Sequence, residues 1–175
     1  MKNRILSTII SLAMIVTMAP TIAFAAESGS DNQVQLQNPR VVSGETIWDC
    51  ICFGSYPQSD TTGKTKDPIK WRVLSVSDTD SDGTADDAFV LANNNLDAKA
   101  YNTSNTSTTW GNCTLKSWLN NEFINTAFTS AEQTAIKTTT VSSGIQDKIY
   151  LLSIDEITKS SYGFSTKKRE EAKPR

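Results

Sequence analysis

The stretch IKWRV at residues 69–73 decides the fold class. Its apolar residues alternate with Lys70 and Arg72, the period of a β-strand with one buried face and one face in water. The strand runs on through Val76, and the apolar run AFVLA at residues 88–92 is its expected partner. The polar, acidic segment between them, residues 78–87, predicts the connection of an antiparallel hairpin.

The segments on either side predict further strands and short helices. Upstream, residues 47–53 are apolar on both faces and end at Gly54, so we expect a central or covered strand. Downstream, Thr114 is the expected N-cap of a helix, and capping boxes predict two more short helices. The expected elements are an apolar helical stripe (Leu115, Trp118, Leu119, Phe123), the boxes Thr129–Glu132 and Ser153–Glu156, and a strand at residues 148–152.

The order of these elements predicts an α+β fold. Strands and helices intermix without the βαβ rhythm of a parallel sheet. We therefore expect a mainly antiparallel sheet with two or three short helices.

The first 25 residues have the three parts of a cleavable secretory signal peptide. Lys2 and Arg4 precede an apolar stretch at residues 5–18, and Ala23-Phe24-Ala25 supplies the small residues before a cut at Ala26. A membrane anchor is the alternative, but polar residues interrupt the stretch and it falls short of the ~20 residues that span a bilayer. We expect a secreted or cell-surface protein that leaves the membrane after cleavage.

The remaining chain is expected to fold as one domain after a spacer. Residues 26–44 are rich in Ser, Gly, Asn and Gln, which predicts a flexible linker, and residues 45–175 have the length of a single domain. The charged tail from Lys167 has no apolar anchor and resembles a cut edge, so the domain is expected to be truncated at its C-terminus.

Charge and composition exclude several functions. Loss of Lys2 and Arg4 with the leader would lower the net charge from −2 to −4, and the other basic residues are mostly scattered, so nucleic acid is not expected as a partner. The chain has no histidine, which excludes serine–histidine, cysteine–histidine and histidine–zinc chemistry.

Three cysteines in an oxidising compartment predict one disulfide and one free thiol. In a strand over residues 47–53, Cys50 and Cys52 point to the same face. Either could therefore meet Cys113, and we favour a Cys50–Cys113 bridge.

The connection at residues 78–86, DTDSDGTAD, has the spacing of a calcium loop. It places carboxylates at positions 1, 3, 5 and 9, glycine at position 6 and a backbone carbonyl at position 7. Phe89 stands where an EF-hand needs glutamate, so the closer likeness is to the calcium-binding β-hairpins of integrin-type propellers. The candidate ligands are Asp78, Asp80, Asp82, Thr84 and Asp86, and the alternative is a solvated acidic turn.

Four motifs resemble one family. They are FGSYPQ at residues 53–58, PIKWRVL at 68–74, WGNCTLKSWLN at 110–120 and KIYLLS at 148–153. Together they are similar to an uncharacterised domain of unknown function in secreted and wall-attached proteins of Gram-positive bacteria.

The resemblance implies a surface role and an incomplete fold. Family members continue past residues 162–164 into a second half that this chain lacks, and the complete pattern suggests a C-type-lectin-like or formylglycine-generating-enzyme-like fold. The family seldom has a cysteine at position 52, which makes Cys52 the better candidate for the free thiol.

The sequence therefore predicts a non-catalytic binding or adhesion module for an extracellular or wall glycan or protein. The candidate stacking residues are Trp48, Tyr101 and Trp110, with core packing as the alternative for each. An enzyme or enzyme remnant acting on polysaccharide, and a non-functional fragment, are the other interpretations. The neighbouring carboxylates Asp155 and Glu156 diverge on a helix and are better explained as first-turn acids.

Overall fold

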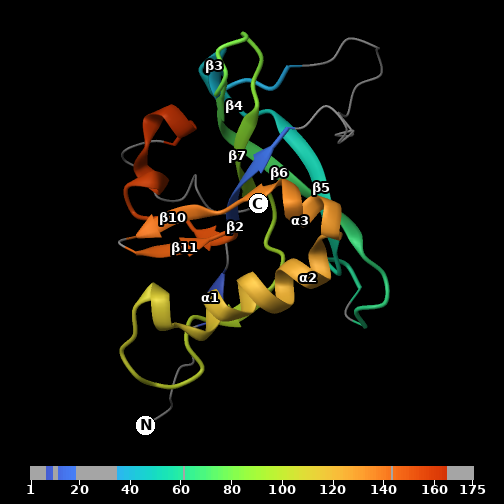
Figure 1. The fold of residues 1–175 in the computed structure, drawn as a ribbon, viewed down its shortest axis with the longest axis vertical. Coiled ribbons are helices and arrows are strands. Elements are labelled where there is room, and N and C mark those ends of the chain that lie inside the picture. Colours follow the sequence, from blue (N-terminus) through green and yellow to red (C-terminus); the bar gives the residue numbers. More distant parts are fainter. Residues whose placement is uncertain (1–6, 10–11, 19–34, 61, 143, 165–175) are drawn as a thin grey trace.

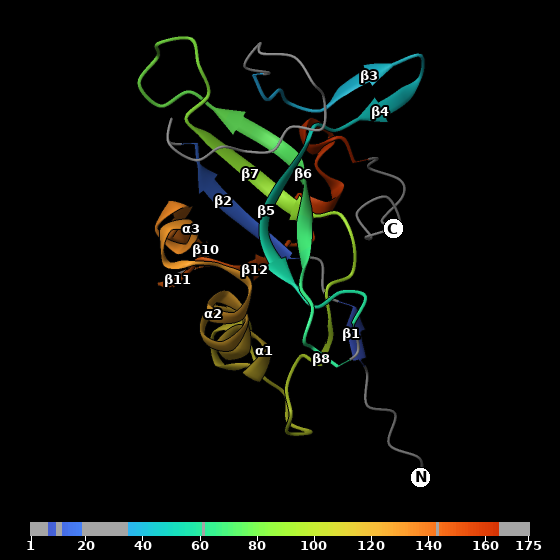
Figure 2. The same ribbon diagram turned by 90° about the vertical axis from the view of Figure 1, so that its right-hand side faces the viewer.

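The computed structural model describes residues 7–9, 12–18, 35–60, 62–142 and 144–164, and of residues 7–9 only the backbone. Its centre is a six-stranded antiparallel sheet with the order β12-β2-β7-β6-β5 and the short strand β9 beside β2. The helices cover one face of this sheet and the C-terminal turns pack on the other (Figures 1 and 2). The α+β class and the antiparallel sheet are thus confirmed.

The strands of the main sheet are β2 (Leu12–Thr17), β5 (Cys50–Tyr56), β6 (Asp67–Ser77), β7 (Asp87–Ala92), β9 (Ile136–Lys137) and β12 (Tyr150–Leu151). Three two-stranded sheets pair β1 (Ser7–Ile9) with β8 (Ala98–Ala100), β3 (Arg40–Val42) with β4 (Glu45–Ile47), and β10 (Thr139–Ser142) with β11 (Ile145–Asp147).

The helical segments are α1 (Thr114–Trp118), a π-helical turn (Leu119–Phe123), α2 (Ile124–Ala127) and α3 (Ser130–Ala135). Short 3-10 turns lie at Trp110–Asn112, Glu156–Thr158 and Ser160–Tyr162. Within the described ranges, no helix has both the length and the apolar character needed to cross a membrane.

The hairpin predicted from IKWRV forms between β6 and β7. Trp71 is fully buried and its indole N–H donates to the Phe53 carbonyl at 2.7 Å. The expectation of a wet second face is wrong, because Arg72 is 5% exposed. Its guanidinium lies 4.7 Å from the centre of the Trp48 ring and donates to Asn93, so a second layer covers this face as well.

The upstream strand differs from the prediction over residues 47–53. The predicted strand is interrupted at Asp49. The Asp49 carboxylate accepts hydrogen bonds from the backbone N–H of Gln37 at 3.0 Å and from the Arg40 side chain at 2.8 Å. β5 then runs to Tyr56 past a bulge at Gly54, which has a φ of +71°. The strand lies at the edge of the sheet rather than at its centre, with its buried side chains toward the helices.

Hydrogen bonds from side chains set the ends of the helices. The capping box between Thr129 and Glu132 is confirmed. The N-cap of α1 is Cys113, whose Sγ accepts from the Lys116 amide at 3.4 Å, because Thr114 instead accepts from the Thr103 amide.

The last predicted strand and helix are shorter than expected. The side-chain oxygen of Asn120 accepts hydrogen bonds from the backbone N–H groups of Lys148 and Ile149, at 3.0 and 3.1 Å. Only Tyr150–Leu151 therefore joins the sheet. The Ser153–Glu156 capping box forms, but it opens only a single 3-10 turn.

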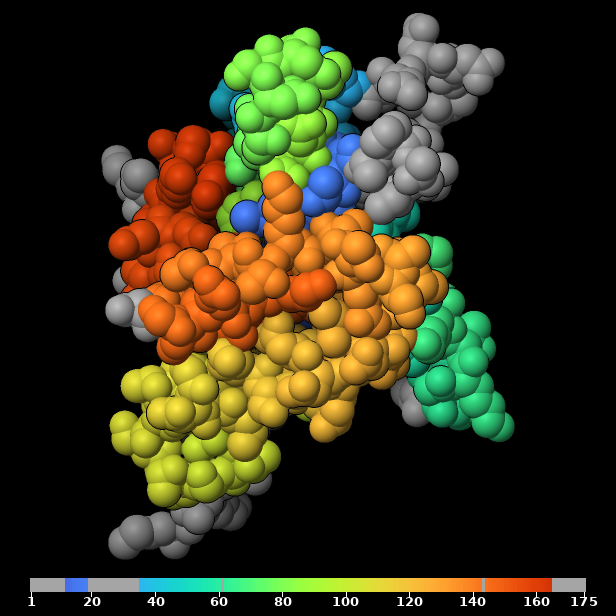
Figure 3. Space-filling model, in the orientation of Figure 1, coloured from blue at the N-terminus to red at the C-terminus, as the bar shows by residue number. Residues whose placement is uncertain are grey.

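Strand β2 comes from the predicted leader and lies inside the sheet. Leu12, Ala13, Met14 and Val16 are 0–1% exposed, and little of β2 (blue) is visible in Figure 3. Burial of its large side chains contributes on the order of 10 kcal/mol, which is comparable with the net stability of a whole domain. Cleavage before Ala26 stays a prediction, and it would remove this strand.

Part of the predicted spacer is structured. The β3–β4 hairpin begins at Arg40, and Asn38 accepts a hydrogen bond from the Val76 amide at 3.0 Å. Residues 26–34 and the charged tail from Lys167 lie outside the described residues.

The bulge at Gly54 provides a test of the packing. A Cβ at this position would lie 2.5 Å from the Phe128 ring and 2.9 Å from the Ala127 carbonyl oxygen. We expect Gly54→Ala to lower the free energy of unfolding by about 3 kcal/mol, through overpacking and the positive φ. Gly63→Ala is the control, because Gly63 has a φ of +72° with no atom near its Cβ position, and it should cost about 1 kcal/mol. Equal losses in urea unfolding would contradict the packing argument.

Candidate functional site

The acidic turn between β6 and β7 gathers three of the predicted calcium ligands. Carboxylate oxygens of Asp78, Asp80 and Asp86 lie within 4.8 Å of one another. Gly83, with a φ of +90°, permits the chain reversal, and its amide donates to Asp78 at 2.9 Å. The turn therefore converges three carboxylates on one centre.

Hydrogen bonds within the turn orient these carboxylates. The Thr79 amide and hydroxyl both donate to Asp86 at 2.6 Å and hold the pKa of this carboxyl below its usual value. Asp82 lies outside the group of three, because its carboxylate accepts from the Thr84 amide at 2.7 Å and from the Thr84 hydroxyl. The full ligand set Asp78, Asp80, Asp82, Thr84 and Asp86 stays a prediction.

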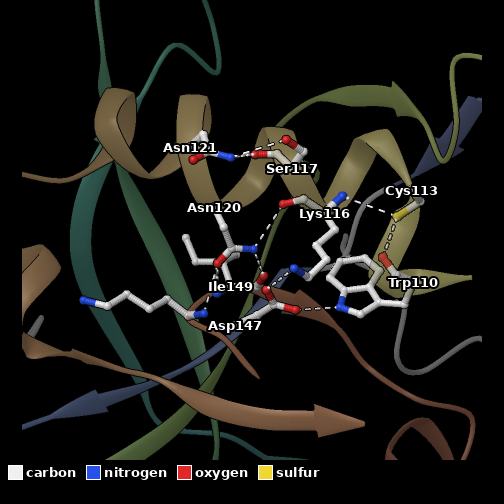
Figure 4. A network of polar contacts seen from close by, with 9 residues as sticks. Trp110, Cys113, Lys116, Ser117, Asn120, Asn121, Asp147 and Ile149 are labelled. Atoms are coloured by element: carbon white, nitrogen blue, oxygen red, sulfur yellow. Dashed lines mark hydrogen bonds and ion pairs between the residues drawn. The ribbon is translucent and has the colours of Figure 1, made fainter. Parts of the chain in front are cut away.

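An ion pair with a buried carboxylate anchors Trp110 (Figure 4). Asp147, which is 4% exposed, accepts the Trp110 indole N–H at 2.7 Å, and its other oxygen pairs with the Lys116 ammonium at 3.1 Å. Cys113 joins the same network, since its Sγ donates to the Trp110 carbonyl at 3.2 Å and accepts from the Lys116 amide. The Trp110 ring is therefore held from both its indole nitrogen and its backbone.

Asn120 ties this network to the end of the sheet. Besides accepting the two amides before β12, its side chain donates to the Ile149 carbonyl at 2.9 Å and to the Lys116 carbonyl at 3.2 Å. Sequence reasoning missed Lys116, Asn120 and Asp147. The (i, i+4) spacing of Lys116 and Asn120 places them on one helix face, but nothing in the sequence shows their partners, which lie 28 or more residues away.

Tyr101 and Trp110 form a half-buried aromatic pair that packs against the core. Their ring centres lie 6.5 Å apart with an angle of 42° between the planes. Burial beside Cys113 raises the pKa of Tyr101. The segment between the two residues consists mostly of exposed Asn, Ser and Thr, so the rings adjoin a hydroxyl-rich and amide-rich loop.

A hollow of about 310 Å³ lies between β8 and α1, next to this loop. Thr103, Trp118 and Glu122 are among its lining residues. The Lys99 ammonium lies 4.8 Å from the centre of the half-buried Trp118 ring, which also packs against the core cluster. The hollow combines an aromatic ring with charged and hydroxyl groups.

Trp48, the third candidate stacking residue, is packed against its neighbours. Its indole N–H donates to the Tyr162 carbonyl at 2.8 Å, and Arg72 covers the ring. A Cβ on Gly163 would lie 2.8 Å from the ring, so this backbone approaches it closely. The structure therefore places Trp48 as a packing residue.

The three cysteines are free in this structure. Cys113 is buried at the start of α1, whereas Cys50 and Cys52 are half-buried on β5. Burial raises the pKa of the Cys50 thiol. The Cys50–Cys113 bridge stays a prediction.

The fold and these groups define a small α+β domain with an acidic turn and an anchored tryptophan beside a polar loop. A family model described as a domain of unknown function (DUF6273) matches residues 85–174, just over half of the chain, and the protein belongs to this family. The match covers the motifs at residues 110–120 and 148–153 and begins after the other two. No curated protein and no solved structure matches the chain.

The contacts of the buried Asp147 predict a measurable coupling between Asp147 and Trp110. Asp147→Ala would leave the Lys116 ammonium and the Trp110 indole N–H without their acceptor, so we expect the free energy of unfolding to fall by about 3 kcal/mol. In a double-mutant cycle with Trp110→Phe, the coupling energy between the two positions should be about 1–2 kcal/mol. Asp155→Ala, on an exposed turn, is the control with little expected change. Additive losses for Asp147 and Trp110 would contradict the anchoring.

Proposed function

We propose that this chain is an exported, non-catalytic binding module of the Gram-positive cell surface whose ligand is a wall glycan. The observation that carries the proposal is the anchoring of the half-buried Trp110 by the buried Asp147. A ring held in place before the ligand arrives loses little conformational freedom on binding. This is the property expected of a stacking platform for a sugar ring.

The surroundings of Trp110 fit such a ligand. Tyr101 adds a second ring, and the loop at residues 102–109 supplies exposed amides and hydroxyls that can hydrogen-bond to sugar hydroxyl groups. The hollow beside Trp118 also combines an aromatic ring with hydroxyl groups, and it lies next to α1. A flat ring with polar donors and acceptors at its edge is typical of carbohydrate recognition.

The alternative of a polysaccharide-cleaving enzyme finds less support. Of its candidate carboxylates, Glu156 accepts hydrogen bonds from the Ser153 amide and hydroxyl at 2.7 and 2.8 Å. This carboxylate therefore caps a turn. The capping role accounts for a glutamate at position 156 without a catalytic function.

Glycan binding is tested on an array of soluble peptidoglycan and wall-polysaccharide fragments. Trp110→Ala should weaken binding of a fragment that the unchanged protein retains by about tenfold or more, because it removes the stacking ring. Trp48→Phe is the matched control, since Trp48 is packed away and its change should alter the melting temperature but not the affinity. Retention of full affinity by Trp110→Ala, with an unchanged circular dichroism spectrum, would refute the platform.

We also propose that calcium binds the acidic turn and stabilises the domain. Three converging carboxylates repel one another in the absence of a cation, and oxygen ligands of this kind suit calcium at the millimolar concentrations found outside cells. The bound ion would hold β6 and β7 together at their connection.

The prediction is a rise in melting temperature with calcium. At a concentration 10 to 100 times a Kd of about 10⁻⁴ M, binding should add roughly 1.4–2.7 kcal/mol to the free energy of unfolding. Asp80→Asn should abolish the rise, whereas Asp82→Asn should keep it, because Asp82 lies outside the group of three. An equal rise with magnesium, or none with calcium, would remove the calcium site.

A further inference from the structure

A second hollow, of about 250 Å³, lies on the face of the main sheet that the C-terminal turns cover (Figure 1). Its apolar lining consists of Ile15 from β2 and Phe89 from β7. The hollow is separate from the proposed glycan platform, because neither Tyr101 nor Trp110 is among its lining residues. The other lining residues all carry polar groups and come from β6, β10, β12 and the C-terminal turns: Ser75, Ser77, Thr139, Tyr150, Glu156 and Tyr162.

Three aromatic rings form one corner of this hollow. The rings of Phe89 and Tyr150 are nearly parallel, with centres 6.1 Å apart and 16° between their planes. The Tyr162 ring meets Phe89 at an angle of 61°, with centres 5.4 Å apart. Burial raises the pKa of Tyr150, and the nearby Glu156 carboxylate acts in the same direction. The phenol therefore stays neutral near neutral pH and can donate a hydrogen bond to a ligand.

Glu156 is the one charged residue among the described lining residues, and one of its oxygens is available. Its Oε2 accepts the two capping hydrogen bonds of its turn, whereas Oε1 accepts none in the described part of the chain. Two ammonium groups on this side of the sheet have other partners. Lys159 lies 4.3 Å from the centre of the Tyr162 ring, and Lys137 pairs with Asp87. The hollow therefore presents one negative charge that no cation of the described chain pairs with.

A hydroxyl group without a partner adds to the polar lining. Thr139 lies near the Tyr150 phenol, yet its Oγ1 is buried and forms no hydrogen bond within the described residues. The other buried side-chain oxygen of this kind in the described chain is Asp87 Oδ1, opposite the lining residue Ser77. Buried polar atoms nearly always have a partner, so two unpaired oxygens at or beside one hollow indicate a place for a polar ligand.

We propose that this hollow binds a small hydroxylated amine, such as an amino sugar with a free amino group. The Glu156 carboxylate would pair with the ammonium, and the adjoining aromatic rings favour a cation because of their quadrupole. The hydroxyl groups of Ser75, Ser77 and Thr139 would hydrogen-bond to those of the ligand. The volume lies below the ~300–1,000 Å³ of sites for drug-sized ligands, so a single sugar ring is the largest ligand expected.

The test is a titration of the full chain with glucosamine, followed by NMR at about pH 6, where the amine is protonated. Glucosamine should bind with a Kd of about 1–10 mM and shift the amide peaks of Ser77 and Thr139, but not the indole N–H peak of Trp110. Glucose, which has a hydroxyl group in place of the amine, should bind at least about tenfold more weakly. Equal binding of the two sugars, or shifts centred on Trp110, would overturn the site.

Two neighbouring carboxylates give a matched pair of variants. Glu156→Gln keeps the shape of the side chain and an oxygen for capping but removes the charge, so it should weaken glucosamine binding by about tenfold or more. Asp155→Asn removes the same charge from the adjacent exposed residue, which does not line the hollow, and should change the affinity by less than about twofold. Equal losses would show a general attraction of the surface for cations and would overturn the site.

A third variant covers a Glu156→Gln protein that fails to fold. Thr139→Val replaces the unpaired hydroxyl group with a methyl group, so it should raise the melting temperature by about 1–3 °C. It should also weaken glucosamine binding by about threefold or more, because the ligand loses a hydrogen-bond partner. Unchanged affinity would overturn the site, and a lower melting temperature would contradict the unpaired hydroxyl group on which it rests.

The outcomes are independent of the proposed wall-glycan ligand, because the two sites share no residue. Trp110→Ala should leave glucosamine binding within about twofold, and Glu156→Gln should leave the retention of wall fragments unchanged. Failure of glucosamine to bind a chain that retains wall fragments refutes this inference alone. Failure to retain wall fragments by a chain that binds glucosamine refutes only the glycan platform.

Discussion

The sheet depends on one buried strand, β2, which hydrogen-bonds to β7 on one side and to β9 and β12 on the other. It joins the β5–β6–β7 meander to the C-terminal half of the domain. Its side chains are buried on both faces, so this strand contributes to both apolar clusters. Any change that empties this position removes hydrophobic burial and backbone pairing together.

The candidate glycan site is connected to the same strand. Asn120 accepts hydrogen bonds from the two backbone N–H groups that immediately precede β12. Asp147, at the end of β11, accepts a hydrogen bond from Trp110 and forms an ion pair with Lys116. Because β12 pairs with β2, the position of the anchored tryptophan depends on β2. The central strand of the sheet and the orientation of Trp110 are therefore linked through Asn120 and Asp147.

The sequence predicted the elements that local patterns specify. The alternation around Trp71 gave the β6–β7 hairpin, and the capping box at Thr129 gave α3, because both depend on residues within a few positions. Long-range hydrogen bonds decided the rest: Asp49 ends one strand by accepting from Gln37, and Asn120 shortens another. The leader motif also carries no signal for its place in the sheet, since an apolar run suits a signal peptide and a buried strand equally. At the acidic turn, spacing identified three converging carboxylates but not the hydrogen bond that holds Asp82 apart.

The bulge at Gly54 has a consequence for assembly. It interrupts the pairing of β5, the outer strand of the sheet, and the Phe128 ring packs against the bulge from the helical layer. An interrupted edge is a poor template for adding another chain, because the bulge breaks the even row of backbone N–H and C=O groups. In this way the bulge at Gly54 would keep the open edge of the sheet from extending into a fibre by strand addition.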